Sequence, residues 1–557
     1  MRVEGSSTLL STVREITDGL SAPSPCPLRG GARGHRTVIS RTVLSLTRMG
    51  RRVPRVAVIV LVSALLACQC GCTNMREWRR NGFQVGPEYC PPAVAVAEDW
   101  IDSTSVRLRH EPPEDSEWWT AFNDPVLNNL VVHAYEQNLD LRTAGFRVME
   151  ARAQRAVTAG NLLPQTQQAS ADYQRIKTPQ RLGRPAAGQY FSAWATDVNL
   201  AWELDFWGRF RRAVEAADAD LHASVENYDD VLVMLLGDVG ITYVEIRTLQ
   251  SRLEAARANV EAQRGALRIA EVRFNEGRST KLDVFQAQNN LAQTESAIPA
   301  LELALRRASN RLCILCGTAP RDLEQELGIG PIPVPPIDVA VGVPADLLHR
   351  RPDVRRAERE LAAQSARIGV ATAELYPHIA ITGTIGLEAN DFTDLFRAEA
   401  FAGSIGPSLR WNILNYGRLL NNIRVQDARF QQLATQYQST VLQANAEAED
   451  ALAAFLKSHE RAATLTDSVE AAQNAVDMAL RQYREGQIDF NRVFILQAAL
   501  AREQDQLAQV SGDVARSLVE IYRALGGGWH SHYQEGEQLQ LVVATTTEGP
   551  QPVASTN

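Results

Sequence analysis

Apolar residues recur at every seventh position in two long polar stretches of the chain. The stretches follow Gly277 and Gly486, and their apolar positions are Val284, Leu291, Ile298, Leu305 and Leu312 in the first and Val493, Leu500, Leu507, Val514 and Ile521 in the second. A heptad lays one apolar stripe against a partner helix and under-winds the pair into a coiled coil. The residues between are mostly Ala, Gln, Glu and Arg, so the pattern predicts paired helices with a solvated outer face.

The chain is built twice from one plan. A shift of 209 positions places Trp202 on Trp411, Gly208 on Gly417, Gly277 on Gly486 and Gly317 on Gly526. In each copy the pattern predicts a long helix of about 100 Å, a turn at a glycine, and a shorter helix over 280–316 or 489–525. This period is far longer than a solenoid repeat, so two large halves are expected. Pro299 should kink or locally unwind the first of the shorter helices.

Four segments ahead of the long helices alternate with period two, which predicts β-strands. They cover 162–174, 191–204, 375–387 and 401–413, and they are rich in Gly, Ser, Thr and aromatic residues. Strands of this length suit a tilted crossing of a membrane. Aromatic residues gather toward their ends, as at a membrane interface: Trp194, Trp202, Trp207, Trp411 and Tyr416. A soluble hairpin with core tryptophans is the alternative.

Four strands are too few to close a membrane barrel, for which eight is the usual minimum. An open sheet edge does not occur in lipid. If the strands span a membrane, several chains must share one barrel, and three chains would supply twelve strands. The same association would wrap the long helices into a tube.

The N-terminal part carries a secretory signal at residues 49–67. Arg51, Arg52 and Arg55 precede a short apolar run, and "LLAC" at 65–68 matches a bacterial lipobox that makes Cys68 the acylated residue. Cys72 fits less well, because Gln69 stands where an apolar residue is wanted. An ordinary cleaved signal or an uncut anchor remain alternatives. Residues 1–48 are not expected to fold, and Met49 is a candidate start.

Charge and motifs exclude several classes of function. The net charge is −8 although residues 1–67 are basic, so the remainder is acidic and nucleic acid is not the expected partner. Common catalytic motifs such as HExxH, GxxxxGK[ST] and GxSxG are missing, and we expect neither an enzyme nor a cofactor or metal site. Cys313 and Cys316 could form a redox pair, but two small apolar residues near a helix end are the favoured interpretation.

Several motifs in order carry a family resemblance over roughly residues 68–528. They are "NGFQVGPEYCPP" (81–92), "WWTAFNDPVLNNLVVHAYEQNLDL" (118–141), "GRSTKLDVFQAQ" (277–288) and "LLHRRPDVRRAERELAAQSARIGVATAELYP" (347–377). The chain resembles the TolC-like outer-membrane efflux proteins, in the lipoprotein branch (NodT-type) that serves resistance–nodulation–division pumps. The last block also reads as a helix on its own, because Pro352 and Asp353 suit a first turn.

The resemblance implies a mainly α fold with transmembrane β-strands. Duplicated long-helix hairpins would form a trimeric α-barrel tunnel in the periplasm, joined to a shared 12-stranded β-barrel in the outer membrane. The homotrimer would be a lipid-anchored, passive export duct for small molecules, loaded by an inner-membrane pump and a periplasmic adaptor protein. The adaptor would contact the helix turns at Gly277, Asp283 and Gly486. The alternatives are an outer-membrane duct for type I protein secretion and a lipid-anchored periplasmic coiled-coil scaffold. The sequence does not identify the exported compound.

The sequence departs from the family where the tunnel usually narrows on acidic residues. The segment here is "RVFILQAA" (492–499), and Ile495 stands in place of the acid. Asp489 and Arg492 lie close by, which suggests an Asp–Arg contact between neighbouring helices as part of a gate. One exposed pair would contribute less than about 1 kcal/mol, so a gate would need several contacts or burial.

The predicted organisation has seven parts. The N-terminal parts are an unfolded or mis-assigned start (1–48), the signal peptide (49–67) and an anchor segment (68–117). The first efflux repeat (118–320), a Pro-rich linker (321–342), the second efflux repeat (343–528) and a polar tail (529–557) follow.

Overall fold

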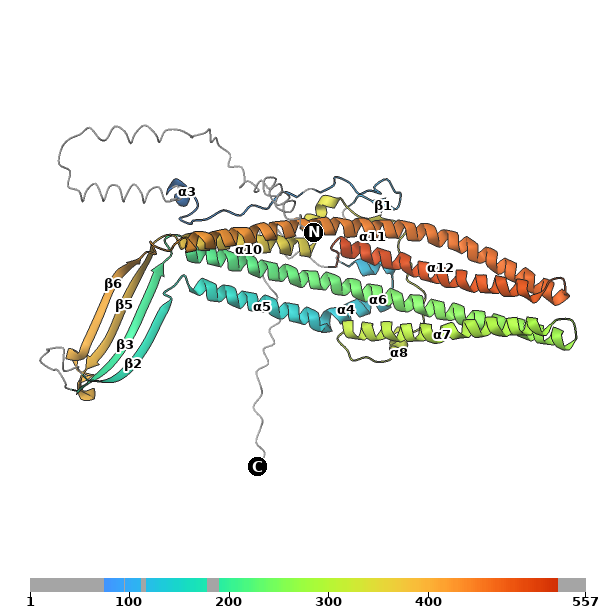
Figure 1. The fold of residues 1–557 in the computed structure, drawn as a ribbon, viewed down its shortest axis with the longest axis horizontal. Helices are drawn as coiled ribbons and strands as arrows, with labels where there is room; N and C mark the ends of the chain where they lie inside the picture. The colour runs from blue at the N-terminus through green and yellow to red at the C-terminus, as the bar shows by residue number, and fades with distance from the viewer. Residues whose placement is uncertain (1–74, 95, 112–116, 178–189, 529–557) are drawn as a thin grey trace, which may run out of the picture. The chain divides into compact units, whose positions relative to one another are not determined.

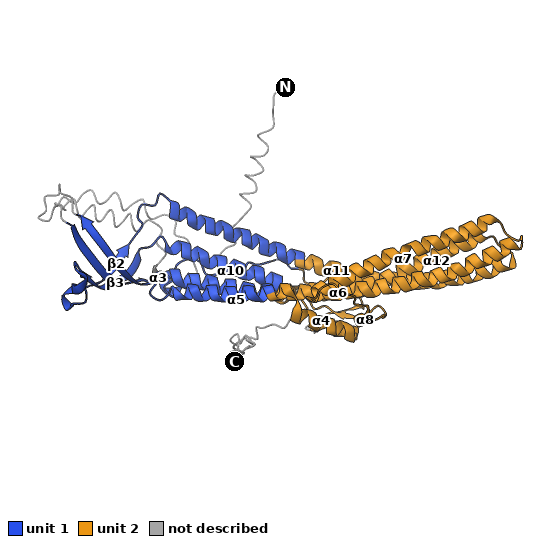
Figure 2. Cartoon of the chain, turned by 90° about the horizontal axis from the view of Figure 1, so that it is seen from below, with its two compact units in different colours: residues 1–96, 143–228, 352–443 blue, residues 97–142, 229–351, 444–557 orange. Residues whose placement is uncertain are grey.

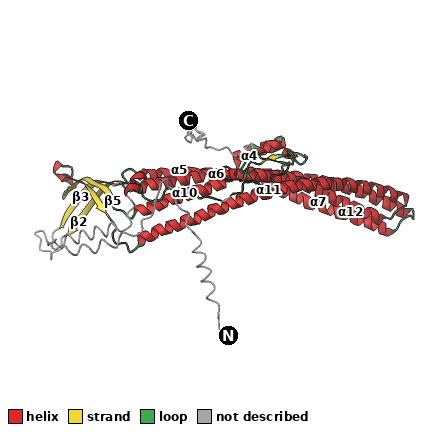
Figure 3. Ribbon diagram, turned by 90° about the horizontal axis from the view of Figure 1, so that it is seen from above, coloured by secondary structure: helices red, strands yellow, loops and turns green. Residues whose placement is uncertain are grey.

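A computed structural model describes residues 75–94, 96–111, 117–177 and 190–528 of the chain (Figure 1). The signal, Cys68, Cys72 and the tail after 528 lie outside the described residues. Long helices dominate, and four strands form one sheet (Figure 3). The helices are α3 (Met75–Arg80), α4 (Pro125–Gln137), α5 (Leu139–Gly160), α6 (Arg209–Asn275), α7 (Lys281–Leu315), α8 (Glu324–Leu327), α9 (Leu347–Arg350), α10 (Pro352–Ala373), α11 (Arg418–Glu485) and α12 (Phe490–Ala524).

The predicted duplication is confirmed by helix lengths and backbone conformation. Helices α6 and α7 have 67 and 35 residues, and their counterparts α11 and α12 have 68 and 35. Equivalent glycines adopt equivalent left-handed conformations, with φ of 80° and 79° at Gly208 and Gly417 and of 70° and 82° at Gly277 and Gly486. Helix α7 continues on both sides of the exposed Pro299, so the expected local unwinding is not seen.

The predicted strands are confirmed with shifts of a few residues. They are β2 (Thr166–Lys177), β3 (Tyr190–Leu204), β5 (His378–Ala389) and β6 (Phe401–Arg410). The sheet is antiparallel with the order β2-β3-β5-β6, so the central pair β3–β5 joins the two repeats. Pro164 and Pro377 each lie four residues beyond the end of α5 or α10, and strands β2 and β5 begin within two residues of them. Two short parallel strands, β1 (Leu108–Arg109) and β4 (Val339–Ala340), pair separately.

The chain divides into two compact units, and each unit contains segments of both repeats (Figure 2). One unit comprises 1–96, 143–228 and 352–443 and includes the four-stranded sheet, α5 and α10. The other comprises 97–142, 229–351 and 444–557 and includes α4, α7 and α12. Helices α6 and α11 each contribute residues to both units.

In the second unit the heptad positions face the interior as predicted. Val493, Leu500, Val514 and Ile521 of α12 are all buried, and so are the first and last heptad positions of α7. Among the described helices, none combines the length and apolarity needed to cross a membrane.

Candidate functional site

The four-stranded sheet has one apolar and one polar face. The strand register places alternate residues on opposite faces. The apolar face carries Trp194, Val198, Leu200 and Trp202 of β3, Ile379, Ile381, Ile385 and Leu387 of β5, and Phe401, Ile405 and Leu409 of β6. Several of these side chains are widely exposed, including Ile405 at 80% and Ile385 at 62%. An exposed apolar sheet face of this size is typical of a lipid contact or a protein interface.

The opposite face is polar and acidic. A hydrogen-bonded row crosses three strands: Ser170 donates to Asp197 at 2.8 Å, Asn199 also donates to Asp197, and Thr384 donates to Asn199 at 2.7 Å. The register adds Asp172 and Glu388 to this face, both opposite Ala195. A face of this kind can line a water-filled passage.

Two predicted interface aromatics lie near opposite ends of β3, on its apolar face. Trp194 contacts the rings of Tyr173 and Phe392 at 4.3 and 5.0 Å, close to the hairpin loops. The indole N–H of Trp202 donates to Leu162 O at 3.2 Å, at the end of the sheet where the helices begin. The two tryptophans are eight positions apart along β3, which corresponds to about 27 Å along the strand. At the tilt of a barrel strand this length corresponds to a height of about 20 Å, close to the apolar band of a membrane barrel.

The other three predicted aromatics lie at the junctions of strands and helices. Trp207 is partly buried and stacks on Tyr376 at 4.5 Å, with its indole N–H donating to Pro377 O at 3.0 Å. Trp411 donates to Leu375 O at 3.0 Å and stays half exposed. Tyr416 is 98% exposed.

The N-terminal motif "NGFQVGPEY" packs on the first of these junctions. Trp78 is buried among Phe83, Phe206 and Trp207, with ring centroids 4.8 to 5.5 Å apart. The guanidinium of Arg211 donates to Gly82 O and Phe83 O at 2.6 and 2.9 Å. These contacts give the motif a structural role that its sequence did not reveal.

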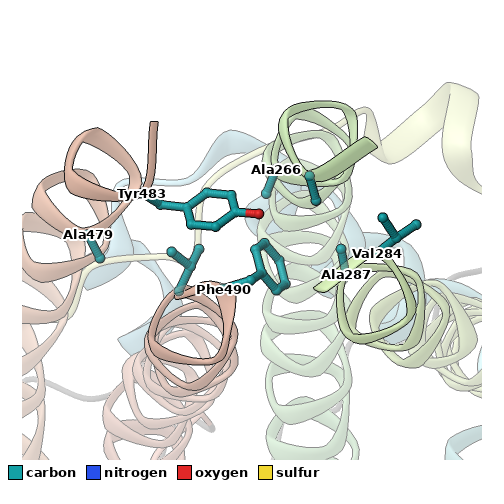
Figure 4. Packing of buried hydrophobic residues seen from close by; sticks show 8 residues of the cluster. Ala266, Val284, Ala287, Ala479, Tyr483 and Phe490 are labelled. Carbon is teal, nitrogen blue, oxygen red and sulfur yellow. The ribbon is translucent and has the colours of Figure 1, made fainter. Parts of the chain in front are cut away.

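The tips of the two helical hairpins pack against each other (Figure 4). Small side chains on α6, α7 and α11 surround two aromatic rings, Tyr483 and Phe490, whose centroids lie 5.3 Å apart. Both rings are fully buried. The cluster consists of Ala266, Ala270, Val284, Ala287, Ala479, Tyr483, Phe490 and Val493.

Polar contacts at the same place join the two repeats. The Tyr483 hydroxyl donates to Asp283 Oδ2 at 3.3 Å. The guanidinium of Arg273 lies over the Tyr483 ring at 4.6 Å and donates to the Tyr483 carbonyl. Burial, with the nearby Asp283 charge, raises the pKa of Tyr483 to about 12, so the hydroxyl stays protonated and able to donate. Sequence reasoning singled out Asp283 and missed Tyr483 and Arg273, although both lie four residues or less before a turn glycine.

The glycine turns end α6 and α11 in the same way. The amide of Gly277 donates to Phe274 O, and that of Arg278 donates to Arg273 O. Gly486 and Gln487 repeat the pattern in the second hairpin. This is a Schellman motif, which requires a left-handed residue after the helix. A Cβ on Gly277 would meet nothing within 4 Å, so the backbone there is open to a partner.

The predicted gate residues lie at the start of α12. The carboxylate of Asp489 caps this helix by accepting from the Arg492 backbone amide at 3.3 Å. The side chains of Arg492 and Ile495 point outward, and Ile495 is 55% exposed. No salt bridge links Asp489 to Arg492 within the part of the chain that the structure describes. Their contact with a neighbouring chain stays a prediction.

The block at 347–377 forms α9 and α10 with Pro352 in the first turn of α10, as predicted. Its arginines join segments distant in sequence. Arg351 is 8% exposed and donates to Ala524 O at 3.0 Å, at the end of α12, and to Glu447 at 2.7 Å. Arg355 lies 2.7 Å from the fully buried Glu226. Burial raises the pKa of Glu226, and the charge of Arg355 opposes this rise.

The described residues contain no group of three or more His, Cys, Asp or Glu side chains placed to hold a metal ion. Cys313 and Cys316 are buried free thiols at the end of α7, as the favoured interpretation expected. Burial raises the pKa of Cys316 to about 11, so its thiol is not activated.

Long helical hairpins and a sheet with one apolar and one polar face are the features that the sequence resemblance predicted for an outer-membrane channel protein. The chain belongs to the family described as "Outer membrane efflux protein", whose model matches residues 130–318 and 343–527. The two matches fall one on each repeat.

Known relatives agree with this assignment. The chain is 29% identical to nodulation protein T of Rhizobium leguminosarum bv. trifolii, over 81% of this chain and 95% of that protein. It is 30% identical to the pyoverdine export outer membrane protein OpmQ of Pseudomonas putida, over 79% and 94%. The solved outer-membrane channel OprN aligns with a TM-score of 0.76 and 34% identity, over 80% of this chain and 99% of that one. The protein is therefore an outer-membrane channel component of an efflux system, in a family of channels and not of enzymes.

Proposed function

We propose that three copies of the chain form one passive duct that carries small molecules through the periplasm and across the outer membrane. The observation that carries this proposal is the four-stranded sheet with an apolar face, a polar face and two unpaired edge strands, β2 and β6. An open edge cannot remain in lipid. Pairing β6 of one copy with β2 of the next would close a barrel of twelve strands, with the apolar face toward lipid and the acidic face toward the passage.

Single-particle electron microscopy of the detergent-solubilised mature protein tests this assembly. We expect a threefold hollow rod with a collar of membrane thickness at one end. Monomers or dimers of bare helical rods would refute the duct and favour an anchored scaffold. A passive duct has no need of a tight substrate site, so selection would rest with an inner-membrane pump.

The hairpin tips are the proposed contact for a periplasmic adaptor. Gly277 and Gly486 are both exposed, and Asp283 lies in the first turn of α7, six residues after Gly277. Site-specific photo-crosslinkers at the exposed neighbours Arg278 and Gln487 keep both turn glycines and would test this contact in cells, with Glu117 as the control position. Crosslinks to one adaptor from both tips and none from the control are expected.

The closed state of the duct would be held at the same tips. Asp489, Arg492 and Ile495 would face neighbouring copies, while the Tyr483–Asp283 hydrogen bond would tie the two hairpins of one copy. Replacing Arg492 by alanine should raise the conductance of the closed duct, and an unchanged conductance would remove this residue from the gate.

The lipid anchor is proposed at Cys68, with Cys72 as the less favoured position. Mass spectrometry of the mature N-terminus decides between them. Acylation at position 68 that disappears in Cys68→Ala is expected, whereas acylation at 72 would shift the anchor by four residues.

A further inference from the structure

We propose that Arg175 and Lys177 form a binding surface for the phosphate groups of an outer-leaflet glycolipid, lipid A. The inference rests on the proposed function, because that function places the helices in the periplasm and the hairpin end of the sheet at the cell surface. Strand β2 begins at the helix end and finishes at Lys177, so both cations lie at the outer end.

The register places both cations on the lipid-facing side. Lys177 is opposite Tyr190 and Arg175 is opposite Ser192, and these partners share a face of β3 with Trp194 and Val198. Asp172 is an odd number of positions from Arg175 along β2, so it lies on the opposite, polar face. A cation on the lipid face is costly within the hydrocarbon layer and tolerated near its border.

The order of residues along β2 follows the layers of a membrane. Tyr173, in ring contact with Trp194, marks the aromatic level that usually sits at the interface. Arg175 and Lys177 follow two and four residues later, about 7 and 14 Å further along the strand. With the tilt of a barrel strand, they rise about 5 and 10 Å above the aromatic level, where lipid phosphates lie.

The contacts of the two cations fit a bound anion. The Lys177 ammonium lies 5.1 Å and the Arg175 guanidinium 5.9 Å from the centroid of the Tyr190 ring. Neither cation is in a salt bridge with a described residue, and Tyr190 is 60% exposed. The ring holds both charges close together, and Arg and Lys are the usual ligands of phosphate.

The test compares lipid A that carries its phosphates with the same lipid after their removal. Binding to the detergent-solubilised protein is measured by native mass spectrometry and by titration at two salt concentrations. Each cation should contribute about fivefold to the affinity for phosphorylated lipid A. The double variant Arg175→Gln, Lys177→Gln should therefore bind this lipid at least tenfold more weakly than the wild type. The wild type should discriminate against the dephosphorylated lipid, and high salt should weaken the difference.

A matched control exists at the hairpin tip of α6 and α7. There Lys281 lies 5.3 Å from the Phe285 ring and Arg278 is exposed, so the variant Arg278→Gln, Lys281→Gln removes two similar cations outside the membrane. It should bind lipid A like the wild type. Equal binding by both double variants, or equal binding of both lipids, would overturn the proposal.

Two further arms separate the possible causes of failure. Strong binding of inorganic phosphate without lipid A binding would replace the glycolipid by a small anion and overturn the proposal. Conductance of the same preparations in planar bilayers reports on the duct itself. If the wild type forms no pore, the proposed function is refuted. If it forms a pore but binds both lipids equally, only the proposed lipid A site is refuted.

Discussion

The Tyr483 hydroxyl donates a hydrogen bond to Asp283 Oδ2 at 3.3 Å, which links the two hairpin tips across 200 positions of sequence. The Tyr483 ring is also part of the apolar cluster between the tips, so one side chain combines packing with a directional contact. The tips can separate only if this contact breaks.

Tyr483→Phe should remove the hydrogen bond and keep the packing. The loss amounts to about 1 kcal/mol for each copy, and it should favour the open state. Single-channel recording should show a larger or more frequent current at rest than in the wild type. Tyr416→Phe, at a residue that is 98% exposed, is the control and should leave the current unchanged. A resting current equal to that of the wild type would assign the hydrogen bond to folding only.

Gly277→Ala should destabilise the first hairpin turn. The backbone has a φ of 70°, where a side chain costs about 1–2 kcal/mol, and there is no clash to add to this cost. Gly265→Ala is the matched control, because Gly265 lies inside α6 with open space around it. That change should stabilise the helix by about 0.5–1 kcal/mol. Thermal unfolding followed by far-ultraviolet circular dichroism should move the two midpoints in opposite directions.

Asp197→Asn should reduce the preference of the duct for cations. Asp197 lies on the polar face and is oriented by Ser170 and Asn199. Loss of its charge in every copy should lower the cation-to-anion permeability ratio about two- to threefold, as expected for a change of about 1 kT in local potential. The reversal potential in a salt gradient measures this ratio. Glu98→Gln, an exposed acid outside the sheet, should have no effect, and an equal shift in both variants would contradict a role for the sheet face.

The helices and strands could be predicted from local patterns, because the heptad of a helix and the alternation of a strand each lie within a single segment of sequence. Helix α12 and strand β3 were placed within a residue or two for this reason. Contacts between distant segments carry no such signal. The Arg351–Ala524 and Tyr483–Asp283 pairs depend on how the two repeats pack. Sequence reasoning therefore singled out Asp283 but not its partner Tyr483, and it assigned no partner to Arg351. The N-terminal motif was recognised, but its docking under Trp207 was not.

Arg351→Met should strongly destabilise the second unit. The buried guanidinium caps the end of α12 and pairs with Glu447, so its removal leaves the Ala524 carbonyl and a carboxylate without their donor. The Glu447 side chain is 60% exposed and stays hydrated, so the expected cost of about 1–3 kcal/mol comes mainly from the unpaired Ala524 carbonyl. Chemical denaturation of the detergent-solubilised protein measures it. Arg278→Met, whose side chain is 73% exposed, is the control and should change stability by less than about 0.5 kcal/mol. Similar midpoints for both variants would show that Arg351 is dispensable for folding.

His459 should make the second unit less stable as the pH falls. Burial, with the charge of Arg107, lowers the pKa of this histidine below its usual value of 6.5, and its ring packs edge-on against Phe455 at 4.5 Å. Below pH 6.5 the unfolded chain takes up a proton that the folded chain resists, so stability is full above this pH and is lost as the pH falls toward the lowered value. The melting temperature of the wild type should therefore drop between pH 7 and pH 5, and His459→Gln should drop less. His110→Gln, at an exposed histidine, should follow the wild type. Parallel curves for all three proteins would rule out His459 as the source of the pH dependence.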